Sequence, residues 1–155
     1  MKLIGKITFV LLVITLITAC GGGPPATVAT LPLYPGATEL QAGESTIADT
    51  LGQNNATDAA MREAMGVGGS TEQKGYRLPA DATWDQVKAY YDEQLKGQGW
   101  QTNSTISAVM EQANAGNDVF RTANWQKGGQ NVTVVMLTLP TDATQKELIV
   151  SLSSQ

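Results

Sequence analysis

The sequence predicts an α+β domain in which an antiparallel sheet meander packs on one long amphipathic helix, giving two layers. Two patterns support this fold class. Apolar residues recur at helical spacing over residues 83–96, and they alternate with polar residues over several segments of the second half. Turn residues separate those segments, as expected for strands joined in a meander. The single domain is expected to span residues 31–155.

The predicted helix over residues 83–96 has the clearest pattern in the chain. Its apolar residues follow one another at three- and four-residue steps and form one stripe, namely Trp84, Val87, Tyr91 and Leu95. Thr83 and Gln86 have the spacing of a capping box, and Gly97 is expected to end the helix. The stripe is therefore expected to face the sheet.

The remaining secondary structure is mostly strand. Strands are expected at residues 38–41, 73–78, 100–105, 119–126, 131–139 and 147–152. Residues 106–113 fit either a strand or a helical turn. Residues 127–130 (KGGQ) predict a hairpin, and a second turn is expected at 141–145. A short helix is expected over residues 58–65, with four residues facing inward: Ala60, Met61, Ala64 and Met65.

Residues 1–19 have the three parts of a secretory signal peptide. Lys2 and Lys6 give a positive start, residues 7–17 are apolar, and small residues follow. A helix over residues 7–19 would be roughly 20 Å long, which is shorter than the hydrocarbon core of a bilayer, about 30 Å. A cleaved signal is therefore favoured over a permanent transmembrane span.

Residues 16–20 (LITAC) place aliphatic and small residues directly before Cys20, the only cysteine in the chain. They resemble the lipobox of bacterial lipoproteins. The resemblance implies that the Cys20 thiol receives a diacylglyceryl group and that signal peptidase II cuts between Ala19 and Cys20. The domain would then be extracytoplasmic and lipid-anchored to the cell membrane. The alternatives are an ordinary secreted protein and an uncleaved anchor with a chance cysteine.

The segment after the cleavage point is expected to connect lipid and domain. Two acyl chains are enough for stable anchoring, whereas one chain binds reversibly. Residues 20–30 contain three glycines and two prolines, a composition typical of a flexible, extended tether. The chain is therefore expected to consist of a signal peptide (1–19), a lipidated cysteine with its tether (20–30) and the folded domain.

Composition argues against several partners and reactions. Without residues 1–19, eight Lys and Arg remain against fourteen Asp and Glu, a net charge of −6 that disfavours nucleic acid as a partner. The chain has no histidine, which removes the common catalytic triads and nearly all zinc sites. The nearest carboxylate pairs, Asp92–Glu93 and Asp81–Asp85, are expected to be solvated. We therefore expect no enzymatic activity, no cofactor and no metal.

Aromatic residues are the best candidates for a binding surface. Six of them could stack on a sugar or a peptidoglycan strand: Trp84, Trp100, Trp125, Tyr76, Tyr90 and Tyr91. Core packing is favoured for those on or beside the apolar stripe. Tyr90 and Trp125 remain as the candidate interaction surface, because exposed apolar patches usually mark interfaces.

A second resemblance concerns the folded domain. Its motifs Tyr34-Pro35-Gly36-Ala37, Tyr90-Tyr91 with Leu95, and Gly99-Trp100 are similar to those of small extracytoplasmic lipoprotein modules, in which a helix ends in Gly-Trp and enters the sheet. The layout of a helix followed by a meander is also similar to the domains of outer-membrane assembly lipoproteins of the BamC kind. These resemblances imply the fold and carry no activity.

The favoured functional hypothesis is a membrane-anchored binding or interaction module at the cell envelope. Its expected partners are the membrane, through the lipid anchor, and a protein of the envelope. One alternative is a carrier of a small molecule or lipid, which requires a cavity of about 300 Å³ or more between helix and sheet. The other is a hydrolase that uses carboxylates alone, which requires two facing carboxylates in a cleft.

Overall fold

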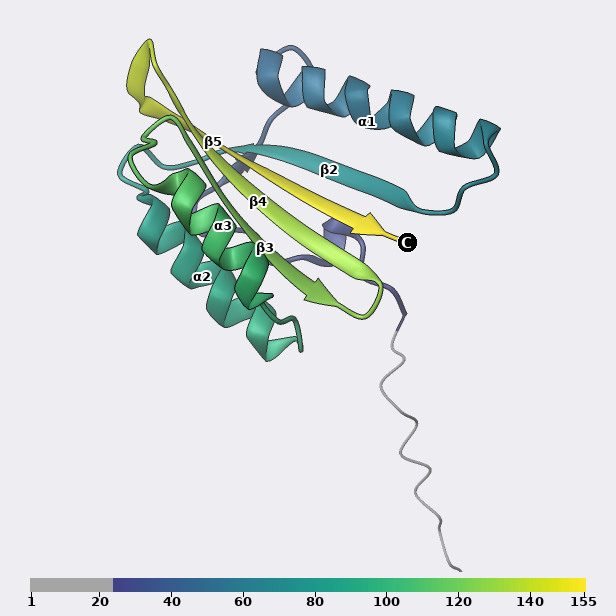
Figure 1. Ribbon diagram of the computed structural model, residues 1–155. Helices are drawn as coiled ribbons and strands as arrows, with labels where there is room; N and C mark the ends of the chain where they lie inside the picture. The colour runs from purple at the N-terminus through teal and green to yellow at the C-terminus, as the bar shows by residue number, and fades with distance from the viewer. Residues whose placement is uncertain (1–23) are drawn as a thin grey trace, which may run out of the picture.

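The computed structural model describes residues 24–155, so the predicted signal peptide and Cys20 lie outside the described residues. One five-stranded antiparallel sheet has the strand order β1-β2-β5-β4-β3 (Figure 1). The strands are β1 (Thr38–Glu39), β2 (Ser70–Arg77), β3 (Phe120–Lys127), β4 (Gln130–Leu139) and β5 (Asp142–Ser154). The helices are the short 3₁₀ helix η1 (Val28–Thr30) and the α-helices α1 (Thr46–Ala64), α2 (Trp84–Gly97) and α3 (Ser104–Asn114).

The predicted amphipathic helix is α2, and its stripe fills the core. All four stripe residues are buried, and Val87, Tyr91 and Leu95 are 0% exposed. They pack against one face of the central strands, formed by Val132, Val134, Met136, Leu148, Val150 and Leu152. The predicted capping box is present, with Thr83 and Gln86 bonding each other's backbone. Local spacing and capping therefore predicted this half of the fold.

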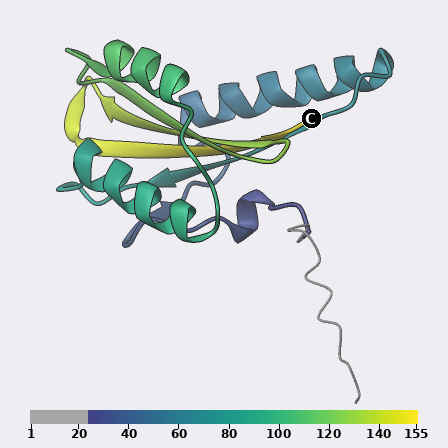
Figure 2. The ribbon, with the colours of Figure 1, turned by 60° about the horizontal axis from the view of Figure 1, so that its bottom comes forward.

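The prediction of one long helix in two layers is wrong, because α1 is longer than α2 and lies on the opposite face of the sheet (Figure 2). It has 19 residues and begins at Thr46, not at residue 58. Its N-cap is Ser45, whose hydroxyl accepts a hydrogen bond from the backbone N–H of Ala48 at 3.1 Å. The four residues predicted to face inward are all exposed, and no residue of α1 is buried.

The strand predicted at residues 100–105 is reduced to a single bridge, in which Gln101 pairs with Gln126 of β3. Asn103 then caps α3, because its side-chain oxygen accepts hydrogen bonds from the backbone of Thr105 and Ile106. The helical alternative for residues 106–113 is confirmed, and the helix covers a full 11 residues. The second predicted turn is also shorter, since β5 already begins at Asp142.

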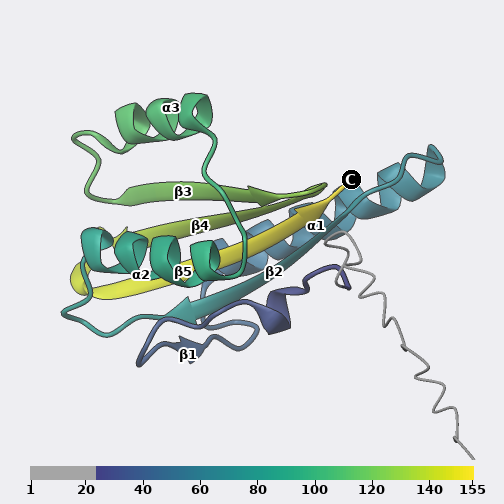
Figure 3. The same cartoon turned by 90° about the horizontal axis from the view of Figure 1, so that it is seen from below.

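Helix α3 lies beside β3 and covers the edge of the sheet (Figure 3). Asn114 at its end is 7% exposed. Its amide donates to the backbone oxygen of Thr122 and accepts from the backbone N–H of the same residue, both at 2.8 Å. This side chain occupies the position that another strand would take. A free strand edge invites pairing with other chains, and α3 covers this one.

Two neighbouring tyrosines on α2 are expected to affect the free energy of unfolding differently when each is changed to Phe. The Tyr91 hydroxyl is buried and has no hydrogen-bond partner among residues 24–155, whereas the Tyr90 hydroxyl donates to the backbone oxygen of Leu33 at 2.6 Å. We expect Tyr90→Phe to lower the free energy of unfolding by about 1 kcal/mol, because it removes a hydrogen bond. Tyr91→Phe should leave stability unchanged or raise it. Urea denaturation of both variants checks this, and an equal loss in both would contradict it.

The same site predicts an alkaline response. Burial raises the pKa of the Tyr91 hydroxyl, with smaller contributions from Tyr90 and Tyr76. The unfolded chain releases this proton near pH 10 while the folded chain retains it, so the free energy of unfolding falls as the pH rises above about 10. We expect a smaller fall in Tyr91→Phe than in the parent protein. Denaturation curves across that pH range provide the test, and identical slopes would refute it.

Candidate functional site

The face of the sheet opposite α2 carries a groove of about 480 Å³. Helix α1 forms one wall with Ile47, Leu51 and Asn55, and Phe120 of β3 stands on the other side. The floor consists of side chains from three strands: Thr71 and Gln73 of β2, Ile149, Ser151 and Ser153 of β5, and Thr133, Val135 and Leu137 of β4. Because side chains alternate along a strand, these floor residues are the neighbours of the core residues, turned to the other face.

The groove has an apolar half and a polar half. The strand registers place Leu137 opposite Phe120 and Val135 opposite Ile149, which groups the apolar residues in two adjacent rows across the sheet. Ile47 and Leu51 are 45% and 37% exposed above them. The next two rows contain only hydroxyl and amide side chains, among them Thr133 paired with Ser151 and Asn131 paired with Ser153.

Hydrogen bonds order the polar half. The Gln73 side-chain oxygen accepts from the Asn55 amide at 2.8 Å and from the Ser151 hydroxyl at 3.4 Å. On β3, the Asn124 amide donates to the Thr133 hydroxyl at 3.0 Å. A row of uncharged polar groups therefore crosses β2, β5, β4 and β3. Within the described part of the chain, no charged side chain lines the groove.

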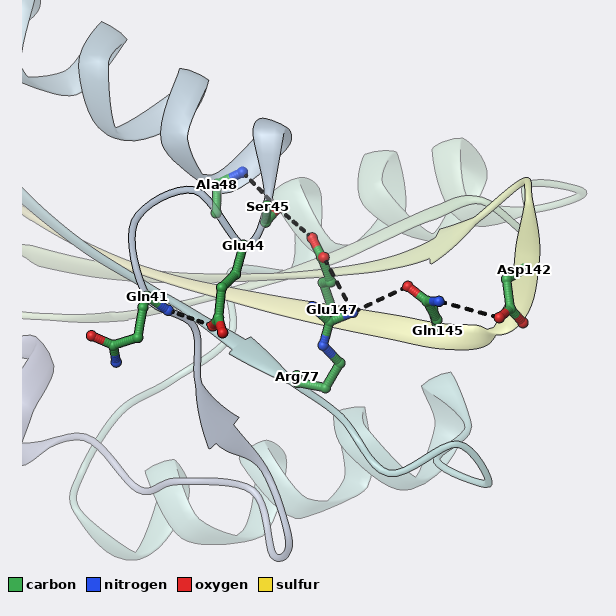
Figure 4. Close-up of polar contacts among 8 residues, drawn as sticks. All are labelled: Gln41, Glu44, Ser45, Ala48, Arg77, Asp142, Gln145 and Glu147. Carbon is green, nitrogen blue, oxygen red and sulfur yellow. Dashed lines mark hydrogen bonds and ion pairs between the residues drawn. The ribbon is translucent and has the colours of Figure 1, made fainter.

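A buried carboxylate holds the start of α1 in place (Figure 4). Glu147 of β5 is 2% exposed, and its Oε2 accepts a hydrogen bond from the Ser45 hydroxyl at 2.6 Å. The other carboxylate oxygen lies 3.8 Å from Nη1 of Arg77, which also donates to the side chain of Gln145 at 3.3 Å. Gln145 in turn donates to Asp142 at 3.2 Å.

The Ser45–Glu147 pair resembles a hydroxyl nucleophile with a carboxylate base in composition, but its surroundings give it a positioning role. Ser45 is 6% exposed, and neither residue lines the groove. A nucleophile has to reach its substrate, whereas this hydroxyl lies beneath the first turn of α1 and is engaged at both its donor and acceptor sides. The pair connects α1 to the central strand and so sets the position of the groove wall.

A second cleft, of about 560 Å³, lies between α2 and α3. Trp125 and Trp100 form its floor, and its sides carry charges of both signs, including Lys88, Asp92 and Glu111. Asp92 accepts hydrogen bonds from the Trp125 indole at 2.9 Å and from Lys88 at 2.8 Å. Asp92, Lys88 and the Trp125 indole therefore satisfy one another, and the charged lining of this cleft, which also includes Lys96, distinguishes it from the groove.

The two residues of the predicted interaction surface, Tyr90 and Trp125, differ in how far they are buried. Trp125 is 2% exposed and packs in the core next to Tyr91, so it does not provide an exposed aromatic surface. The alternation of β3 explains this, because Trp125 lies opposite Val132 and turns toward α2. Tyr90 is half-buried and packs edge-to-face against Tyr34 and Tyr91. An interaction through Tyr90 stays a prediction.

No pattern in the sequence indicated that the groove residues form a site. Its floor residues alternate with core residues and read as the outer side of ordinary strands, and its wall belongs to the part of α1 that was not predicted. The alternating polar and apolar rows of residues 131–139 and 147–153 were the available signal. Within residues 24–155, no cluster of three or more His, Cys, Asp or Glu side chains could hold a metal ion. No described helix is long and apolar enough to cross a membrane.

Comparisons with protein-family models, with curated proteins and with solved structures give no match for this chain.

The Ser45–Glu147 pair predicts an unequal response of two helix caps. Ser45→Ala removes a cap, worth about 1 kcal/mol, and also leaves a buried carboxylate with one partner fewer, worth a further 1–3 kcal/mol or so. Thr83→Ala removes only the cap of α2. We expect the urea midpoint to fall further for Ser45→Ala than for Thr83→Ala. Equal losses would show that Glu147 does not depend on the hydroxyl.

Proposed function

We propose that this protein is a non-enzymatic, lipid-anchored binding module of the cell envelope, and that the groove beside α1 binds an uncharged amphiphile. The groove carries the binding part of the proposal. The anchor rests on the sequence, where residues 16–20 end an apolar leader at Cys20.

The lining of the groove favours a neutral ligand. Residues 24–155 contain eight basic and fourteen acidic residues, yet none of these lines the groove. A charged group placed there would lose hydration without gaining an ion pair, which is unfavourable. An uncharged head group with hydroxyls can instead exchange hydrogen bonds with the row of Ser, Thr, Asn and Gln side chains, which provides both donors and acceptors.

The apolar half favours an alkyl or acyl chain. Ile47, Leu51 and Phe120 are each more than a third exposed, so a chain laid between them covers apolar surface on both sides. Each buried methylene contributes about 0.8 kcal/mol. The volume of about 480 Å³ lies within the range of ligand sites, roughly 300–1,000 Å³.

Two other roles remain as alternatives. A carrier with an enclosed cavity under the predicted helix has no room there, because the stripe of α2 fills that space, so a carrier would have to use the open groove. A protein partner in the envelope would place an apolar segment of its own against Ile47, Leu51 and Phe120. Both alternatives use the same surface, and the ligand titration separates them.

Titration with octyl glucoside below its micelle concentration tests the ligand class. We expect saturable amide shifts at Val135 and Ser151, and we expect Leu51→Arg to weaken binding at least about tenfold, or 1.4 kcal/mol. Val109→Arg is the matched control, because Val109 is 63% exposed on α3 and does not line the groove.

The head group provides a second comparison. Octyl sulfate and octyl trimethylammonium carry the same chain with a charge, and we expect both to bind more weakly than the glucoside. Equal binding of all three would reduce the site to a general apolar surface and favour a protein segment as its occupant. Loss of binding in both arginine variants would place the ligand outside the groove.

The anchor has its own test in cells. We expect Cys20→Ser to give an uncleaved or mislocalised precursor without acyl chains, because the thiol is the acceptor that the lipobox resemblance implies. Thr18→Ser keeps a small residue before the cysteine and should be processed normally. Mass spectrometry of the N-terminal peptide and membrane fractionation provide the readout. A mature Cys20→Ser protein that still partitions into membranes would disprove the anchor.

A further inference from the structure

The C-terminal part of α1 extends beyond the part of the helix that packs on the sheet. Asn55 is half-buried and bonds to Gln73 of β2, whereas every residue of the segment 56–70 is exposed. Yet this segment contains large apolar side chains: Met61, Met65 and Val67 are 57%, 62% and 51% exposed. We call these three residues the α1 tip. Exposed apolar groups gathered in one place usually mark an interaction surface.

The strand registers place the α1 tip at one end of the sheet. The loop after α1 leads directly into Ser70, the first residue of β2. Ser70 pairs with Ser154 at the end of β5, and Ser154 pairs with Gln130 at the start of β4. The C-terminus and the hairpin between β3 and β4 therefore lie at this end too, as Figures 1 and 3 show.

The N-terminal segment enters the fold at the same end. Ala26 is held there by the side chain of Gln130, which accepts from its backbone N–H and donates to its backbone oxygen, both at 2.9 Å. Two residues later, the backbone N–H of Val28 donates to Glu72 of β2 at 2.9 Å. These contacts determine which end of the sheet faces the beginning of the chain.

Chain length then limits the distance to the anchor. Five residues lie between Cys20 and Ala26, and the six extended steps that join the two positions span at most about 20 Å. β4 is 10 residues long, so the turn between β4 and β5 lies about 30 Å from the end of the sheet at which Ala26 is held. If Cys20 carries the lipid, as the proposed function has it, this end of the sheet is the one close to the bilayer.

The geometry points to a second membrane contact: Met61, Met65 and Val67 dip into the interface of the bilayer that holds the lipid of Cys20. Met61 and Met65 are four residues apart and lie on the same side of α1. Methionine is flexible and polarisable, which suits contact with a mobile surface. Arg62 is paired with Asp58 at 2.6 Å, and Glu63 adds a negative charge, so the contact is apolar and not an attraction to anionic lipid.

A depth measurement on the lipidated full chain tests this contact. Because Cys20 is the only native cysteine and is blocked by lipid, Met65→Cys gives a single reactive thiol for an environment-sensitive fluorophore. In vesicles of neutral phosphatidylcholine we expect a blue-shifted emission that nitroxide-labelled lipid quenches. Thr141→Cys is the matched control, because Thr141 is exposed in the turn at the opposite end of the sheet, and its label should remain unquenched.

Flotation of the same vesicles separates the two proposals. If the protein floats with the vesicles but the labels at positions 65 and 141 are quenched equally, or neither is quenched, the α1 tip contact is overturned and the anchor remains intact. Protein that does not float with the vesicles would overturn the anchor and the contact together. Met61→Asp in the Met65→Cys background should abolish the quenching, and unchanged quenching would contradict an apolar contact. A requirement for anionic lipid would contradict it as well.

Discussion

The contact between Ser45 and Glu147 determines where α1 lies, and the groove and the α1 tip both depend on the position of α1. A carboxylate that is 2% exposed is costly to keep charged unless its oxygens are satisfied. Ser45 provides a hydrogen bond to one oxygen and Arg77 lies near the other. The same hydroxyl accepts the first backbone N–H bond of α1, so satisfying the carboxylate and starting the helix require one geometry.

The two faces of β4 and β5 have different roles. One set of alternating residues packs with α2 and excludes water, and the other set forms the floor of the groove. The core face consists of large aliphatic side chains, which suits close packing. The opposite face changes along the strands from aliphatic residues near Glu147 to Ser, Thr and Asn near the hairpin. Such a change adds nothing to the core, and it gives the groove its two chemically different halves.

Local sequence patterns predicted the parts of the fold that local interactions hold together. The stripe and capping box of α2 and the alternation of residues 131–139 need no distant partner to be recognised. Helix α1 was shortened in the prediction because residues 54–57 (NNAT) offer helix caps, whereas its true start depends on a contact between residues 102 positions apart. The end of α3 likewise depends on Asn114 and the edge of β3, which no spacing in the sequence reveals. The groove was missed for the same reason, since its wall is α1.

Helix α1 couples the two proposed contacts through its own stability. It buries no residue within the described chain, so it is held by its cap, by Asn55 and by partial contacts with β2, and it belongs to the less stable part of the fold. An amphiphile against Ile47 and Leu51 and a bilayer against Met61 and Met65 would each bind the helical form preferentially. Anything that binds only the ordered form stabilises it, and two such ligands favour each other's binding by the same factor. Helix α1 is held at its start and lines the groove with its first half, and with the proposed membrane contact at its second half it would link ligand binding to attachment at the bilayer.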